Sequence, residues 1–238
     1  MKSSMFFAAV ASLMPTLAMG LVGISWNVTG VPSSGLRNIT FPFNIAQTPH
    51  RSGYYFAQQF NFVGQRDVGY AGLQPRPDSN GQPIIHGVFS SFIAGTTTSD
   101  PNCHTGADGG PGVSCSVDFP GRYADTWNVE ISNVVGTTWR GDLFNTVTGS
   151  RVHIGTYTLP PGTQGIAGNQ LGFVEYYPWN SGTHTCNSLP YSSVTFGVPR
   201  SSVGRGSLSD AFEYGDCVGK VGYRSSRDAL GVRVQVGF

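Results

Sequence analysis

Short strand-like runs separated by turn sequences occupy most of this chain and constrain its fold more than any other feature. Residues 53–63 (GYYFAQQFNFV) and 151–159 (RVHIGTYTL) carry aromatic or aliphatic side chains at alternating positions, which is the period of a strand with one buried face. About ten such runs occur, and no segment shows a sustained helical period. The predicted strands are 36–45, 53–63, 68–74, 83–93, 126–135, 138–147, 151–159, 171–179, 193–198 and 230–238. Turn formers end several of them, at 148–150 and 160–162 for example. The pattern predicts an all-β protein with two antiparallel sheets, a β-sandwich or jelly roll, with little or no helix.

Composition agrees with this fold class and excludes some partners. Glu occurs only at positions 130, 175 and 213, and Lys only at 2 and 220, whereas Gly reaches 33 residues; Lys and Glu favour helix surfaces. The formal net charge is only +1. We therefore expect no nucleic-acid partner, because nothing in the bulk charge attracts a polyanion.

The first twenty residues have the pattern of a signal peptide. Lys2 is followed by an apolar run from Met5 to Leu17 and then by small residues up to Gly20, as a secretory leader requires. The run is too short to span a bilayer. We expect cleavage before Leu21, secretion without a membrane anchor, and one β-sandwich domain over residues 21–238.

Four cysteines and two glycosylation sequons follow in the predicted mature chain. Secretion favours two disulfides, and four cysteines allow three pairings. Sequence order favours Cys103 with Cys115 and Cys186 with Cys217. His104 adjoins Cys103, but the spacings match no zinc pattern, so we predict no metal and no cofactor. The sequons begin at Asn27 and Asn38 and predict a glycoprotein with this end exposed.

Several segments between residues 53 and 200 resemble a known family. The segments YYFAQQFNFVGQRDVGYAGLQP, GVFSSF, GADGGPGVSC, VHIGTYTLP, GFVEYYPW and SSVTFGVP are similar in order and spacing to secreted microbial proteins that carry domain of unknown function 3472. The resemblance implies a β-sandwich of the concanavalin-lectin type. It implies no catalytic residues, and the glycine-rich loop here has Asp108 where the family is expected to have Glu.

Aromatic and amide side chains on one sheet face are the candidate ligand-binding groups. Alternation along residues 53–63 directs Tyr55 and Gln59 to the face opposite Tyr54, Phe56, Gln58 and Phe60. Rings stack on the apolar side of a sugar while amides bind its hydroxyls. The same reasoning selects Tyr70, Gln74 and Trp179, although aromatic residues in a sandwich also fill its core.

An enzyme on this scaffold would need acid–base groups. Glu130 and Glu175 each lie in a strand-like run between apolar neighbours, so both could project from one face as a hydrolase pair. His86 is the candidate base of a lyase, four residues after Gln82. It could equally be a half-buried strand histidine.

The segment 69–92 is predicted to be two neighbouring strands joined by a turn at Asp78, Asn80 and Gly81. The leading hypothesis is a secreted, monomeric, non-catalytic protein that binds cell-wall or matrix polysaccharide. The alternatives are a polysaccharide lyase or glycoside hydrolase on the same scaffold, and a secreted effector or virulence protein that binds a host protein.

Overall fold

The structure is a computed structural model that describes residues 20–238, so all of the predicted signal peptide except Gly20 lies outside the described residues. Fifteen strands are found in this part of the chain: β1 (Gly20–Val28), β2 (Asn38–Asn44), β3 (Tyr54–Asn61), β4 (Val68–Pro75), β5 (Ile84–Ser91), β6 (Cys103–Ala107), β7 (Gly110–Pro120), β8 (Thr126–Val135), β9 (Thr138–Asn145), β10 (Arg151–Thr158), β11 (Asn169–Tyr176), β12 (Ser192–Phe196), β13 (Gly206–Glu213), β14 (Arg224–Arg227) and β15 (Val232–Val236). The 3₁₀ helices η1 (Tyr177–Ser181) and η2 (Cys186–Ser188) follow β11.

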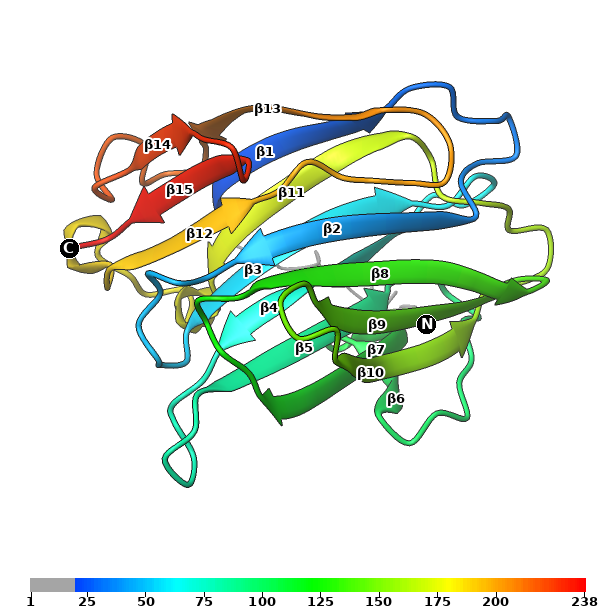
Figure 1. The fold of residues 1–238 in the computed structure, drawn as a ribbon, viewed down its shortest axis with the longest axis horizontal. Coiled ribbons are helices and arrows are strands. Elements are labelled where there is room, and N and C mark those ends of the chain that lie inside the picture. Colours follow the sequence, from blue (N-terminus) through cyan, green and yellow to red (C-terminus); the bar gives the residue numbers. More distant parts are fainter. Residues whose placement is uncertain (1–19) are drawn as a thin grey trace, which may run out of the picture.

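The strands form two antiparallel sheets that pack face to face (Figure 1). The eight-stranded sheet has the order β13-β1-β11-β3-β4-β5-β7-β6, and the seven-stranded sheet has the order β10-β9-β8-β2-β12-β15-β14. The predicted β-sandwich is confirmed.

Aromatic side chains from both sheets fill the space between them. Phe89 of β5 stacks on Tyr157 of β10, with ring centroids 4.3 Å apart, and Trp26 of β1 meets Phe41 of β2 edge to face at 5.2 Å. Each large buried side chain of this kind contributes roughly 1.5–3 kcal/mol by leaving water. This core covers the inner face of the eight-stranded sheet, so the site described below lies on the outer face.

Five strands were not expected from the sequence: β1, β6, β7, β13 and β14. The predicted glycine-rich loop around Asp108 is in fact part of the β6–β7 hairpin. Its turn is Asp108-Gly109, with φ of 48° and 76°, and Ala107 pairs with Gly110. Both values suit a two-residue type I′ turn, for which Asp-Gly is a preferred sequence. The glycines in this segment therefore shape a hairpin.

Two disulfides are confirmed, Cys103–Cys115 within this hairpin and Cys186–Cys217 between η2 and the segment after β13. Between residues 20 and 238, no helix has the length and apolarity needed to cross a membrane.

Candidate functional site

One row of side chains crosses the outer face of the eight-stranded sheet. Glu175 of β11 pairs with Tyr55 of β3, and Gln74 of β4 pairs with His86 of β5, which pairs in turn with Asp118 of β7. Alternation decides this arrangement, because in each strand the residues before and after belong to the opposite face. The pairing of five strands thus brings residues from position 55 to position 175 of the chain into one line.

A cleft of about 540 Å³ lies over this row. Tyr55, Tyr70 and Phe92 form an aromatic part of its wall. The buried Phe173 meets Tyr55 edge to face at 5.7 Å, and Tyr70 contacts both Phe173 and Phe92, at 5.1 and 4.6 Å. The full lining is Tyr55, Tyr70, Gln74, Arg76, His86, Val88, Ser90, Phe92, Asp108, Ser114, Ser116, Glu175, Tyr177 and Asn180. Apolar walls with a few convergent polar groups are typical of ligand sites.

Glu175 is the buried acid of the cleft. The residue is only 6% exposed, and its Oε1 accepts a hydrogen bond of 2.6 Å from Asn180 Nδ2. Burial raises the pKa of the Glu175 carboxyl, and the negative charge of Asp108 raises it further, while the Asn180 hydrogen bond opposes both. A carboxyl in this state holds its proton to a higher pH than an ordinary glutamate and can act as a general acid.

Asp108 is the second acid, and it reaches the cleft from the turn of the β6–β7 hairpin. Although much of the residue is exposed, its carboxyl lines the cleft, and desolvation there raises its pKa. Its charge also raises the pKa values of Tyr55 and Tyr70, in each case after the larger effect of burial. Asp108 therefore faces Glu175 and both tyrosines across the same space.

Tyr55 has a buried hydroxyl that no described residue satisfies. Burial, followed by the charges of Asp108 and Glu175 and by Tyr70, raises the pKa of this phenol well above its ordinary value. The hydroxyl thus remains a neutral donor. An unpaired donor beside two carboxyls can hydrogen-bond a ligand oxygen that develops negative charge.

The opposite end of the row holds Arg76 and His86 beside Asp118. Arg76 and His86 are 21% and 18% exposed in their side chains and share the carboxylate of Asp118, which is 61% exposed. The His86 Nδ1 to Asp118 Oδ1 distance is 2.7 Å. Arg76 Nη1 donates to the Tyr177 hydroxyl at 3.3 Å. Burial, then the neighbouring Arg76 charge, lowers the pKa of His86 against the opposing effect of Asp118.

The structure places five of the eight predicted binding and catalytic residues in this cleft: Glu175, His86, Tyr55, Tyr70 and Gln74. Gln59 lies on the same sheet and pairs with Tyr70, but it does not line the cleft. Their proposed roles stay predictions.

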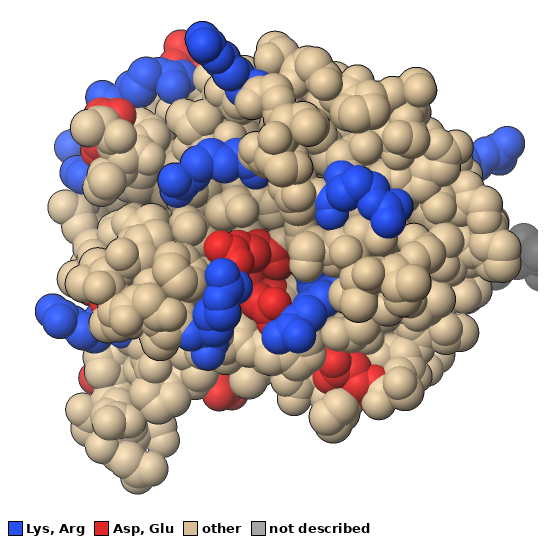
Figure 2. Space-filling view, turned by 45° about the vertical axis from the view of Figure 1, so that its right-hand side comes forward, with Lys and Arg blue, Asp and Glu red and all other residues tan. Residues whose placement is uncertain are grey.

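The prediction that Glu130 and Glu175 share a face is wrong. Glu130 lies in β8 of the other sheet, where Arg151 Nη1 donates to its Oε2 at 2.6 Å. Asp142 of β9 pairs with Glu130 in register and binds Arg140 Nε at 2.7 Å. Figure 2 shows acidic side chains in the middle of one face of the molecule with basic ones around them. Glu130 therefore forms an ion pair with Arg151 and lies on the other sheet from the cleft.

Trp179 is also not an exposed platform. It lies in η1, is 7% exposed, and packs on Tyr176 and His184, at ring-centroid distances of 5.6 and 4.7 Å. The strand predicted over 171–179 ends at Tyr176. The 3₁₀ helix η1 begins at Tyr177, has Pro178 in its first turn and carries the indole into the core.

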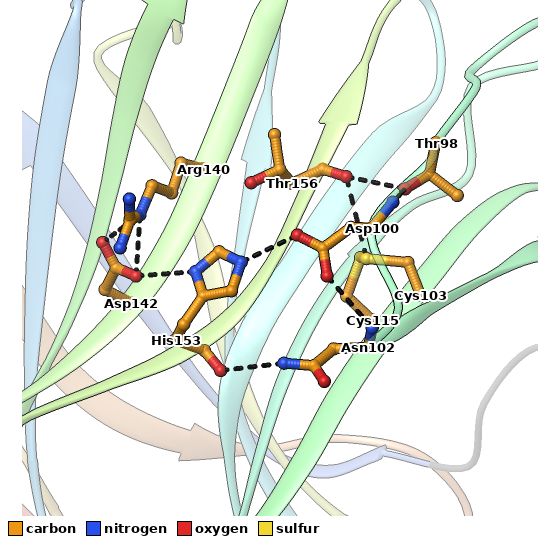
Figure 3. Close-up of polar contacts among 9 residues, drawn as sticks. All are labelled: Thr98, Asp100, Asn102, Cys103, Cys115, Arg140, Asp142, His153 and Thr156. Atoms are coloured by element: carbon orange, nitrogen blue, oxygen red, sulfur yellow. Dashed lines mark hydrogen bonds and ion pairs between the residues drawn. A yellow bond between two sulfur atoms is a disulfide. The ribbon is translucent and has the colours of Figure 1, made fainter.

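A second polar cluster surrounds His153 on β10 (Figure 3). His153 Nε2 binds Asp100 Oδ2 at 2.7 Å and Nδ1 binds Asp142 Oδ1 at 2.9 Å. Asn102 Nδ2 donates to the carbonyl of His153 at 3.1 Å. Burial lowers the pKa of His153, but the two carboxylates outweigh it, so the pKa is raised. Both ring nitrogens are occupied, and the cluster fastens the segment before β6 to the seven-stranded sheet.

The two sequons differ in their surroundings. Asn27 is exposed on β1. Asn38 is half-buried, with Nδ2 donating to Ser202 Oγ at 2.9 Å and Oδ1 accepting from the backbone N–H of Ser202 at 2.9 Å.

Nine of the fourteen residues that line the cleft were not predicted as site residues, among them Asp108, Arg76 and Asn180. Asp-Gly at 108–109 is a strong hairpin signal, which could have placed Asp108 at a turn. No local pattern says that this turn reaches a cleft formed by β3 and β11.

No family model matches this chain, and no curated protein matches it. Among solved structures, scytalido-glutamic peptidase with a peptide-based transition state analogue is 12% identical with a TM-score of 0.49, covering 93% of this chain and 100% of that one. SCP-B, a member of the eqolisin family of peptidases in complex with the tripeptide Ala-Ile-His, is 10% identical with a TM-score of 0.41 over the same shares. The CBM2 module of the evolved Dit of Lactobacillus casei BL23 phage J-1 is 15% identical with a TM-score of 0.29, covering 64% and 68%.

These comparisons contradict the prediction of a non-catalytic polysaccharide-binding protein, because the solved structures that match over 93% of the chain are peptidases. Their identities and TM-scores are too low to transfer an activity. Any activity has to be inferred from the residues of the cleft.

Proposed function

We propose that this protein is a peptidase active in acid, with Glu175 and Asp108 as its catalytic carboxyls. The observation that supports this most directly is that both carboxyls line one cleft with raised pKa values, beside the unpaired hydroxyl of Tyr55. Peptidase is the activity named for the similar structures, but the proposal depends on these residues.

The environments of the two acids suggest their roles. Glu175 is the more enclosed, and the charge of Asp108 adds to the rise in its pKa, so the proposal makes Glu175 the proton donor and Asp108 the base. Asp108 takes a proton from water as the water oxygen bonds to the peptide carbonyl carbon. Glu175 gives its proton to the amide nitrogen, and the C–N bond breaks. Proton exchange with solvent then restores both groups.

The remaining cleft groups would position the substrate. The hydroxyl of Tyr55 donates to the carbonyl oxygen as it becomes negative, which is the kind of stabilisation that preorganised donors supply. Asn180 holds the Glu175 carboxyl through Oε1. The aromatic group around Tyr70 and Phe92 supports an apolar side chain of the substrate.

The test is digestion of denatured casein and a mixed peptide library by the purified protein between pH 3 and pH 7, with new amino termini identified by mass spectrometry. Glu175→Gln and Asp108→Asn should each lower kcat by about 10²–10⁴-fold. Glu130→Gln is the matched control, because it removes the same carboxyl from the other sheet, and it should leave the rate unchanged. Folded protein that releases no new termini, or full activity in Glu175→Gln, would refute the proposal.

A further inference from the structure

Arg76 and His86 lie at a fixed distance from the catalytic end of the row. Glu175, Tyr55, Gln74 and His86 occupy β11, β3, β4 and β5, which are successive neighbours in the sheet. With neighbouring strands about 4.8 Å apart, His86 is roughly 14 Å from Glu175 across the sheet. An extended peptide covers that distance in about four residues.

Arg76 is held in place before any ligand binds. Its backbone N–H donates to the Tyr123 hydroxyl at 2.9 Å, and its Nη1 donates to Tyr177 and, at 3.4 Å, to the carbonyl of Pro75. A guanidinium fixed in this way loses little further freedom on binding, and its planar donors match the two oxygens of a carboxylate.

His86 supplies a second donor next to this cation. Its Nδ1 is engaged by Asp118, so Nε2 is the nitrogen left for a ligand. Protonation turns Nε2 from an acceptor into a donor. The charged groups that bear on the ring are Arg76 after β4 and Asp118 on β7, and most of the Asp118 side chain is exposed to solvent. Solvent screening weakens the competition of Asp118 with a ligand carboxylate for Arg76 and His86.

Resting on the proposed peptidase function, we propose that Arg76 and His86 form a subsite for a substrate carboxylate about four residues from the cleaved bond. The carboxylate comes from an acidic side chain or from the C-terminus of a short peptide. The enzyme would thus select negatively charged polypeptide segments, although its overall charge is close to neutral.

The experiment measures kcat/KM for matched peptides at pH 5. One series replaces Glu by Gln at each position from two to six residues on either side of the cleaved bond, and a second series compares a C-terminal acid with its amide. One charged hydrogen-bonded pair should favour the carboxylate by roughly 10–100-fold. The first series reports the side-chain source and the second reports the C-terminal source.

Substitutions then test whether the preference for acidic over neutral peptides comes from this subsite. Arg76→Gln should bring the acid-to-neutral ratio of kcat/KM close to one, and Asp118→Asn should increase the ratio because a competing carboxylate is removed. Arg140→Gln, a matched loss of charge on the other sheet, should leave the ratio as in the wild type. A ratio near one in the wild type, or one that survives Arg76→Gln, would overturn the subsite while the peptidase proposal stands.

Binding to the Glu175→Gln protein separates the two proposals. Calorimetric titration of the same acid and amide peptides needs no hydrolysis, so it tests the subsite even if no peptide is cleaved. Tighter binding of the acid peptides that is lost on adding Arg76→Gln would support the subsite alone. Equal binding of both forms would count against it.

Discussion

Replacing Gln58 by Met should stabilise the protein. Gln58 lies in β3 with its side chain facing the core, and the residue is 1% exposed. Within residues 20–238, neither its Oε1 nor its Nε2 has a hydrogen-bond partner. The side chain lies over Gly172 of β11, where an added Cβ would come within 2.3 Å of Oε1.

The magnitude follows from the two unpaired amide groups. Each buried unsatisfied group costs roughly 1–3 kcal/mol. Met fills a similar volume without a cavity and brings no donor or acceptor, and a core replacement of this kind costs less than about 1.5 kcal/mol in packing. We therefore expect the free energy of unfolding to rise by about 2 kcal/mol for Gln58→Met. At this chain length that corresponds to a Tm increase of roughly 4–8 °C.

The assay is guanidinium unfolding monitored by fluorescence, with the m-value expected to stay constant. Gln59→Met is the matched control: the neighbouring residue is half-buried on the opposite face of the strand, and its replacement should change stability by less than about 0.5 kcal/mol. If Gln58→Met were less stable than the wild type, the Gln58 amide would have hydrogen-bond partners in solution, and the argument from its unpaired groups would be wrong.

Three further outcomes follow from the structure. Cys103→Ala with Cys115→Ala should lower the free energy of unfolding by about 3 kcal/mol, measured by urea titration, because the bond closes a loop with a sequence separation of 12; an unchanged midpoint would contradict this. The raised pKa of His153 means that its contribution to stability is complete below the ordinary value of 6.5 and is lost as pH rises through the folded-state pKa. Tm should therefore fall less above pH 6.5 in His153→Gln than in the wild type. The corresponding free energy of unfolding is at most about 1 kcal/mol for this partly exposed group, and identical pH profiles of Tm would exclude the effect. In a eukaryotic expression host, peptide mapping should find glycan on Asn27 and little on Asn38, whose Nδ2 is already donated to Ser202; the reverse occupancy would contradict the prediction.

Local alternation was sufficient to predict much of the fold and part of the site. In β3 it assigned Tyr55 to the outer face and Phe56 to the core, as the structure has them. The turn at Asn80-Gly81 could be predicted because Asn and Gly adopt positive φ most easily. In the structure their φ values are 51° and 72°. Each of these features depends only on neighbouring residues.

Tertiary structure decided which of these local faces meet. Glu130 and Glu175 each have an apolar or aromatic neighbour on either side, yet they lie in different sheets, because a period of two fixes the face within a strand but not the strand's partners. Asp108 reaches Glu175 only because the β6–β7 hairpin adds to the edge of the sheet that also contains β11. The sequence by itself therefore determined the side-chain alternation, the turn at Asn80-Gly81 and ten of the fifteen strands found in residues 20–238. Long-range strand pairing determined which acids, tyrosines and cations share the cleft.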